Sequence, residues 1–112
     1  TEAGIKANRA KGVAAEAKAA GELVQEGRTI LGSQVGVQTK QGLRKVDHLT
    51  QTAQGQVVGV EVKAGTGTRT AAQRAKDAEI ASEGGKVVGK NAPENLRGRK
   101  VKFPTEERRY PD

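Results

Sequence analysis

The chain has 112 residues, with 20 Lys and Arg against 13 Asp and Glu, and its formal net charge is +7 at pH 7. This length suits one small domain, and the mixed signs of charge indicate a folded chain rather than a disordered one. Cysteine is absent and histidine occurs once, which excludes disulfides, thiolate zinc sites and cysteine nucleophiles and leaves oxygen atoms as metal ligands. No apolar run is long enough to cross a bilayer, so we expect no membrane-spanning segment.

The first predicted element is a helix over residues 7–26 that ends at Gly27. Alanine is frequent in it, and some apolar residues recur at helical spacing, which predicts one buried face. The residues of this expected buried stripe are Val13, Ala17, Ala20 and Val24. Glu16 borders the stripe, whereas we expect Glu22 and Glu26 to face solvent.

From residue 30 the apolar residues alternate with a period of two, as in Val35 and Val37. Turn sequences at residues 40–42 and 52–55 separate this strand from two others, over residues 43–50 and 56–63. Consecutive strands joined by such short turns pair with one another, so this region predicts a three-stranded meander.

A helical pattern returns over residues 70–83 and stops at Gly84-Gly85. We expect short strands over residues 86–90 and 99–103, and a loose tail after them. The order of helix, three strands, helix and one or two strands predicts an α/β fold. We therefore expect residues 1–112 to form a single domain with a core over about residues 7–103.

Asp47 lies in the second predicted strand, and Glu61 and Lys63 lie in the third. Neighbouring strands would bring these two carboxylates and one amine together, which suits a Mg²⁺ or Mn²⁺ site, with the ammonium group orienting a metal-bound water. The reaction would be phosphodiester hydrolysis. The alternative is a solvated face of an amphipathic strand. His48 follows Asp47 and points to the opposite face, so we expect a packed or solvated histidine rather than a catalytic one.

Four segments carry a resemblance to a known family. They are Gly12-x-x-x-Glu16 with Ala20, Leu23, Gly27 and Ile30, then Gly42-x-x-x-x-Asp47, Val60-Glu61-Val62-Lys63-Ala64-Gly65, and Gln73-x-x-x-Asp77. Over roughly residues 12–92 the chain resembles the PD-(D/E)xK, or restriction-endonuclease-like, nuclease superfamily. The resemblance implies an α-β-β-β-α-β core with a small mixed sheet flanked by helices.

The same resemblance implies roles for five residues. Asp47 and Glu61 would bind the divalent metal, Mg²⁺ or Mn²⁺ with Zn²⁺ as a further option, and Lys63 would activate the water. Glu16 from the first helix would complete the metal site, with Glu22 as its rival. Gln73 on the second helix would contact substrate or metal, or be an ordinary exposed helix residue.

A narrower resemblance depends on the Glu61-Val62-Lys63-Ala64-Gly65 segment, the Gln73 helix and the glycine-rich stretch at residues 84–89. These resemble the C-terminal toxin domains of contact-dependent growth inhibition and other polymorphic toxin systems of bacteria. The resemblance implies a piece of a secreted or cell-surface delivered protein that acts in the target-cell cytoplasm, and a start at Thr1 without methionine fits this. It also implies a cognate immunity protein, which the positive charge of the domain predicts to be acidic.

The excess of positive charge gathers toward the C-terminus, which predicts a surface that follows nucleic-acid phosphates. The residues expected to contact nucleic acid are Arg69, Gln73, Arg74, Lys76, Arg97, Arg99, Lys100 and Lys102. We expect an endonuclease acting on DNA, because RNA, with its own 2′-hydroxyl nucleophile, does not strictly require a metal site of this kind. The alternatives are the same active site acting on RNA such as tRNA, and a non-enzymatic basic module that only binds nucleic acid.

Overall fold

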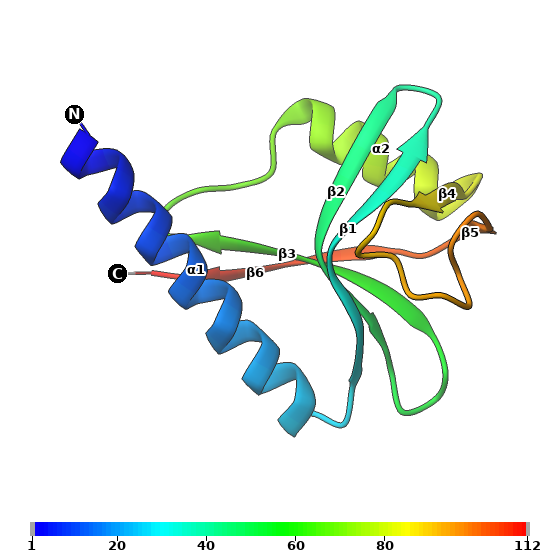
Figure 1. Cartoon of the computed structure of the whole chain (residues 1–112), viewed down its shortest axis with the longest axis horizontal. Coiled ribbons are helices and arrows are strands. Elements are labelled where there is room, and N and C mark those ends of the chain that lie inside the picture. The colour runs from blue at the N-terminus through cyan, green and yellow to red at the C-terminus, as the bar shows by residue number, and fades with distance from the viewer. Residues whose placement is uncertain (1, 112) are drawn as a thin grey trace.

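The computed structural model describes residues 2–111, with the side chains from residue 9 onward. Within these residues the chain forms a mixed α/β fold of two helices and six strands (Figure 1). The elements are α1 (Glu2–Gln25), β1 (Thr29–Thr39), β2 (Gly42–Gln51), β3 (Val57–Ala64), α2 (Ala71–Ser82), β4 (Gly85–Val88), β5 (Lys100–Val101) and β6 (Thr105–Tyr110). Neither described helix has the length and apolar character needed to cross a membrane.

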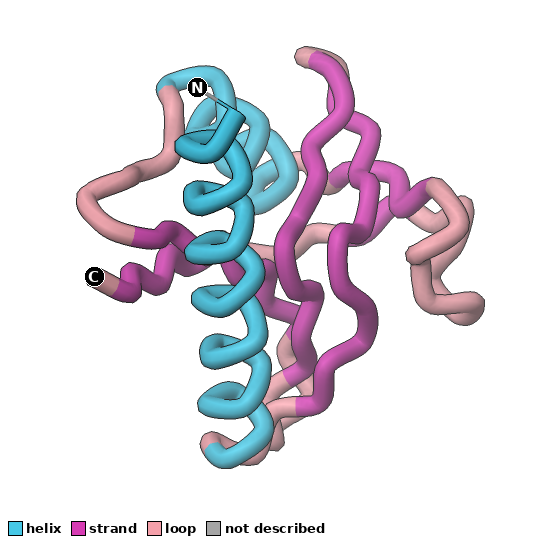
Figure 2. Tube along the Cα trace, turned by 60° about the vertical axis from the view of Figure 1, so that its left-hand side comes forward, coloured by secondary structure: helices cyan, strands magenta, loops and turns pink. Residues whose placement is uncertain are grey.

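All six strands join one sheet in the order β5-β4-β1-β2-β3-β6. The β1–β2–β3 meander is antiparallel, as its short turns predict, and β4 and β5 extend it antiparallel on one side. On the other side β6 runs parallel to β3. The long helix α1 runs beside the strands (Figure 2) and packs against β3, β1 and β6, whereas α2 packs against β2 and β1.

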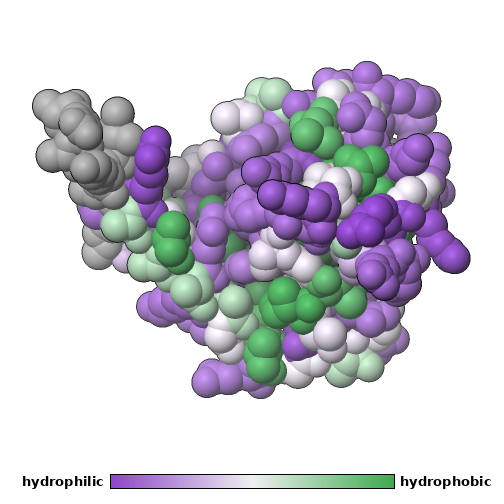
Figure 3. Space-filling view, in the orientation of Figure 1, coloured by the Kyte–Doolittle hydropathy of each residue, from purple (hydrophilic) through white to green (hydrophobic). Residues whose placement is uncertain are grey.

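The core consists of two small clusters, in keeping with a chain that has two aromatic residues among its 112. One cluster joins α2 to the sheet and contains Val35, Val37, Val46, Leu49, Ile80, Val87, Ala92 and Phe103. The other joins α1 to β3 and contains Ala15, Ala19, Leu23, Val60 and Val62. On the face shown in Figure 3 the surface is mostly hydrophilic, with apolar patches between the charged side chains.

The buried face of α1 is not the one predicted. Ala15, Ala19 and Leu23 are buried, while Val13 and Val24 are 65% and 58% exposed. Alanine covers several sides of this helix, so apolar periodicity alone does not select the face. The small side chains of Ala15 and Ala19 let the helix backbone approach β3 closely, and that fit decides which side is buried.

The prediction of a loose tail after residue 103 is also wrong, because β6 occupies residues 105–110. Its pairing with β3 is bracketed by backbone hydrogen bonds from Gly59 N to Pro104 O (2.9 Å) and from Gly65 N to Tyr110 O (3.0 Å). Arg108 adds two hydrogen bonds to the Glu26 carboxylate at the end of α1, at 2.6 and 2.7 Å. The polar sequence of β6 has weak strand propensity, so pairing with a distant strand determines its structure. The expected strand over 99–103 shortens to β5.

The second helix is confirmed, and its start has a specific cause. Thr70 caps α2 by accepting a hydrogen bond from Gln73 N, and the Gln73 side chain accepts one from Thr70 N at 2.9 Å. This reciprocal pair satisfies two backbone donors that the first turn leaves free. The helix ends just before Gly84, whose φ of +94° suits glycine.

Candidate active site

The predicted acidic residues meet where β2 and β3 separate. The ladder between these strands ends at the His48–Val60 pair, and beyond it the Asp47 side chain takes the place of a backbone partner. Asp47 Oδ2 accepts a hydrogen bond from Val62 N at 2.8 Å. The carboxylate is thereby held directly between Glu61 and Lys63 of the third strand.

Glu16 of α1 reaches the same place through Gln34, a residue that was not predicted from the sequence. The side-chain Nε2 of Gln34, on β1, donates to Glu16 Oε1 at 3.2 Å and to Asp47 Oδ1 at 3.3 Å. The rival Glu22 lies elsewhere on the helix, where its carboxylate accepts a hydrogen bond from the Tyr110 hydroxyl at 3.1 Å. The structure therefore brings Glu16, and not Glu22, to Asp47.

His48 fixes the position of α1 at this point. It is 5% exposed, its Nε2 lies 2.9 Å from the Glu16 carbonyl oxygen and its Nδ1 lies 2.8 Å from Ser33 Oγ. Since a carbonyl oxygen only accepts, Nε2 carries the proton, and in the neutral ring Nδ1 accepts from the serine hydroxyl. Of the two expected alternatives, packed or solvated, the structure shows a packed histidine. Its bond to the main chain holds Glu16 beside the sheet.

Glu61 belongs to a buried ion-pair network that links β2, β3 and α2. Arg44 donates to Glu61 Oε2 at 3.0 Å and to Asp77 Oδ1 at 2.8 Å, and all three side chains are at most 5% exposed. Lys63 Nζ lies 3.3 Å from Glu61 Oε1, and Arg69 Nη1 lies 3.0 Å from Asp77 Oδ2. Glu61 is held between two cations, and Arg44 fixes its direction.

Burial and neighbouring carboxylates raise the pKa of Glu16 and of Glu61. Burial raises the pKa of Glu16 above its ordinary value, and the charges of Asp47 and Glu61 raise it further, against the lowering effects of His48 and of the hydrogen bond from Gln34. Burial and Asp47 also raise the pKa of Glu61, although Arg44 and Lys63 act in the opposite direction. The three carboxylates of Glu16, Asp47 and Glu61 in one partly buried place favour the binding of positive charge there.

The donor set suits a hard divalent cation, since carboxylate oxygens are the ligands that Mg²⁺ and Mn²⁺ prefer. Within the described residues, however, no three acidic or histidine side chains converge closely enough to hold one ion as they stand. Two features of the site oppose convergence. The amide of Gln34 lies between Glu16 and Asp47, and Glu61 is turned toward Arg44 and Lys63. Coordination would require these side chains to exchange their present partners.

The residues expected to contact nucleic acid fall into two groups. The first is at α2, where Arg69 is paired with Asp77 and Glu107 and Gln73 closes the helix cap. Arg74 and Lys76 there donate to main-chain carbonyls. Arg69 and Arg74 border a cavity of about 280 Å³.

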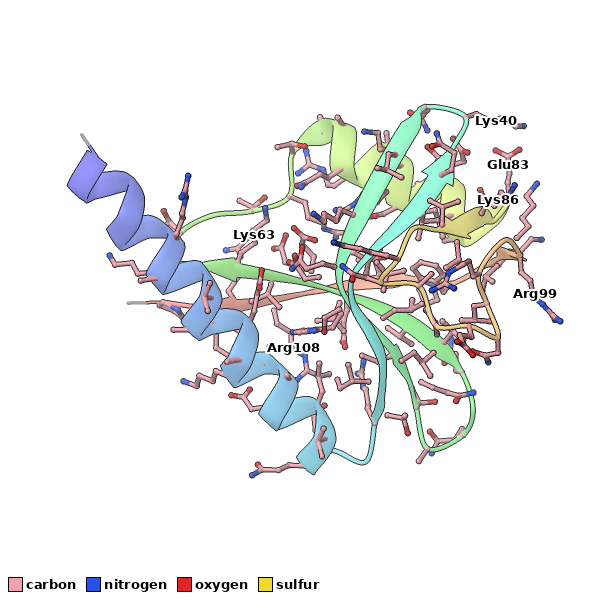
Figure 4. All side chains as sticks on the ribbon, in the orientation of Figure 1. Lys40, Lys63, Glu83, Lys86, Arg99 and Arg108 are labelled. Atoms are coloured by element: carbon pink, nitrogen blue, oxygen red, sulfur yellow. The ribbon has the colours of Figure 1, made fainter. Side chains whose placement is uncertain are left out.

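The second group is formed by Arg97, Arg99, Lys100 and Lys102, which are exposed around β5. Lys100 borders a cavity of about 500 Å³ together with Lys40 and Lys86. In Figure 4, Lys40, Lys86 and Arg99 lie on the side of the molecule away from Lys63 and α1. The second group therefore lies away from Lys63.

Gln34, Arg44 and the role of Asp77 were not predicted from the sequence. A signal existed for Arg44, because it stands two residues before Val46 on a strand whose alternate positions are buried. A charge at a core position indicates a buried partner. No comparable signal marked Gln34, whose placement depends on a local irregularity of β1.

Comparison of the chain with protein-family models, with curated proteins and with solved structures gave no significant match.

Proposed function

We propose that this domain is a metal-dependent endonuclease that hydrolyses phosphodiester bonds of DNA. The observation that carries the proposal is the meeting of Glu16, Asp47, Glu61 and Lys63, from α1, β2 and β3, at the point where two strands separate. In this proposal the fold is a restriction-endonuclease-like core, for which the observed order of α1, the β1–β3 meander, α2 and β4 gives support.

Glu16, Asp47 and Glu61 would hold one or two Mg²⁺ or Mn²⁺ ions. A metal ion bound there would supply charge neutralisation for the phosphate and an acidified water at neutral pH. Lys63, 3.3 Å from Glu61, is 22% exposed at its side chain and so reaches both the carboxylates and solvent. Its ammonium group donates hydrogen bonds and orients the attacking water or a phosphate oxygen. Arg44 positions Glu61 and does not itself meet substrate, because it is 4% exposed.

The positive charge of the chain supports a nucleic-acid substrate. The net charge is +7, and Arg74 and Lys76 lie on α2, which the Arg44–Asp77 contact joins to the acidic cluster. Phosphate contacts by such side chains position a duplex without reading its sequence.

Cleavage assays with supercoiled plasmid and with tRNA, each in Mg²⁺, Mn²⁺, Zn²⁺ or EDTA, test the proposal. We expect plasmid cleavage that requires a divalent metal and that falls by roughly a hundredfold or more in Asp47→Asn, Glu61→Gln and Lys63→Met. Glu16→Gln should lose more activity than Glu22→Gln. Lys90→Met, at an exposed lysine outside the residues expected to contact nucleic acid, serves as the matched control and should cleave like the wild type.

Three results would change the conclusion. A folded Asp47→Asn protein that cleaves at the wild-type rate would show that the active site does not lie in this cluster. Efficient cutting of tRNA that depends on Glu61, with plasmid untouched, would replace DNA by RNA as the substrate and keep the site. Binding of nucleic acid without cleavage in any metal would favour a non-enzymatic basic module.

We further propose that the domain is a toxin, delivered as part of a secreted or cell-surface bacterial protein into a target cytoplasm and neutralised by an acidic immunity protein. Its charge of +7 favours association with an acidic partner at low ionic strength. Expression of the domain in bacteria should arrest growth, and Glu61→Gln should relieve the arrest. If no neighbouring reading frame protects the cells, the toxin role fails while the nuclease proposal stands.

A further inference from the structure

Gln34 is the one described residue other than glycine with a positive φ, at 54°. This left-handed conformation is disfavoured for a side chain of its kind, so surrounding contacts must maintain it. The pairs Ser33–His48 and Val35–Val46 flank it in the β1–β2 ladder. That register sets Gln34 opposite Asp47, at the centre of the acidic cluster.

One group of the Gln34 side chain, its amide nitrogen, makes two hydrogen bonds. Its Nε2 donates one hydrogen to Glu16 Oε1 at 3.2 Å and the other to Asp47 Oδ1 at 3.3 Å. A side-chain amide nitrogen carries two hydrogens and accepts nothing, so both of its hydrogens are committed. The NH₂ group thus lies between two carboxylates and relieves their repulsion without carrying a charge.

A divalent cation held by Glu16 and Asp47 is incompatible with this amide orientation, because the NH₂ hydrogens would point at the ion. The other end of the same amide is a carbonyl oxygen, which is a ligand for hard cations. A half-turn about the last side-chain bond exchanges the two ends without moving the backbone.

We propose that Gln34 is an exchangeable ligand of the proposed metal site. Its amide nitrogen binds Glu16 and Asp47 in the metal-free protein, and its Oε1 turns to the cation when Mg²⁺ or Mn²⁺ enters. This inference rests on the proposed function, since it assigns a fourth protein ligand to that site. The backbone of Gln34 stays fixed during the exchange, and Asn91 Nδ2 helps to hold it by donating to the Gln34 carbonyl oxygen at 3.3 Å.

The alternative is that Gln34 only braces the metal-free site. The two roles predict opposite changes in metal affinity when the amide is removed. Loss of a ligand weakens binding, whereas loss of a brace leaves Glu16 and Asp47 repelling each other, which strengthens binding.

The experiment is calorimetric titration of Mn²⁺ into metal-free wild type, Gln34→Leu, Gln34→Gly and Gln38→Leu. Gln38 is an exposed glutamine of the same strand, which makes its variant the matched control. We expect a dissociation constant about tenfold weaker in Gln34→Leu and Gln34→Gly, and unchanged in Gln38→Leu. Glycine accepts the positive φ without strain, so Gln34→Gly tests the amide even where leucine fails to fold.

Gln34→Glu distinguishes the role of the amide oxygen from that of the amide nitrogen, since it keeps an oxygen and loses the NH₂ donors. We expect it to bind Mn²⁺ at least as tightly as the wild type and to unfold at a lower temperature in EDTA. Equal or tighter binding in both Gln34→Leu and Gln34→Gly would overturn the ligand role, provided that Asp47→Asn abolishes binding. If the wild type itself binds no Mn²⁺, the proposed metal site fails, and this inference fails with it.

Discussion

Replacing Arg44 by methionine tests the buried ion-pair network in isolation from catalysis. Arg44 is 4% exposed and contacts two carboxylates that are equally buried, Glu61 at 3.0 Å and Asp77 at 2.8 Å. Removing one partner of a buried ion pair costs about 3–5 kcal/mol, because the remaining charge stays buried. Each carboxylate keeps a second cation, Lys63 at 3.3 Å and Arg69 at 3.0 Å. We therefore expect the free energy of unfolding to fall by about 3 kcal/mol, the lower end of that range.

Urea denaturation of the metal-free protein at pH 7.5 measures this loss. Arg99→Met, at an exposed arginine near β5, is the matched control and should leave the midpoint nearly unchanged. Asp77→Asn added to Arg44→Met should recover part of the loss, since it removes one of the two stranded charges. A loss no larger than that of Arg99→Met would show that the network does not stabilise the fold, and our account of how Glu61 is held would be wrong.

Two more predictions concern α1. Burial and neighbouring carboxylates raise the pKa of Glu16 above 4.5 in the folded chain. Ionisation of Glu16 therefore lowers the free energy of unfolding of the metal-free wild type as the pH rises from about 4.5 through the raised pKa. Glu16→Gln should therefore be more stable than the wild type at pH 8 and equal to it at pH 3, by thermal denaturation in EDTA. A variant less stable at pH 8 would contradict the assigned crowding of negative charge. Leu23→Ala should cost about 2–5 kcal/mol and Val24→Ala almost nothing, although the two are neighbours, since only Leu23 is buried. Similar losses in urea denaturation would show that α1 packs with its other face.

The part of this protein that the sequence by itself determines is local. The alternation of valines and the short turns at residues 40–42 and 52–55 specify the meander, because strands joined by tight turns pair with each other. Adjacent strands then bring Asp47 near Glu61 and Lys63 without further information. The cap of α2 is local as well, since Thr70 and Gln73 contact each other within one turn.

Only the tertiary structure decided the rest, because it depends on contacts between distant segments. Several sides of α1 are apolar, and the fit of Ala15 and Ala19 against β3 selected the buried one. The polar β6 became a strand because β3 offered an unpaired edge, whose hydrogen bonds outweigh weak strand propensity. Likewise, Gln34 reached Glu16 and Asp47 through an irregular backbone at β1. Such arrangements draw their energy from pairs far apart in the chain, which no periodicity within one segment encodes.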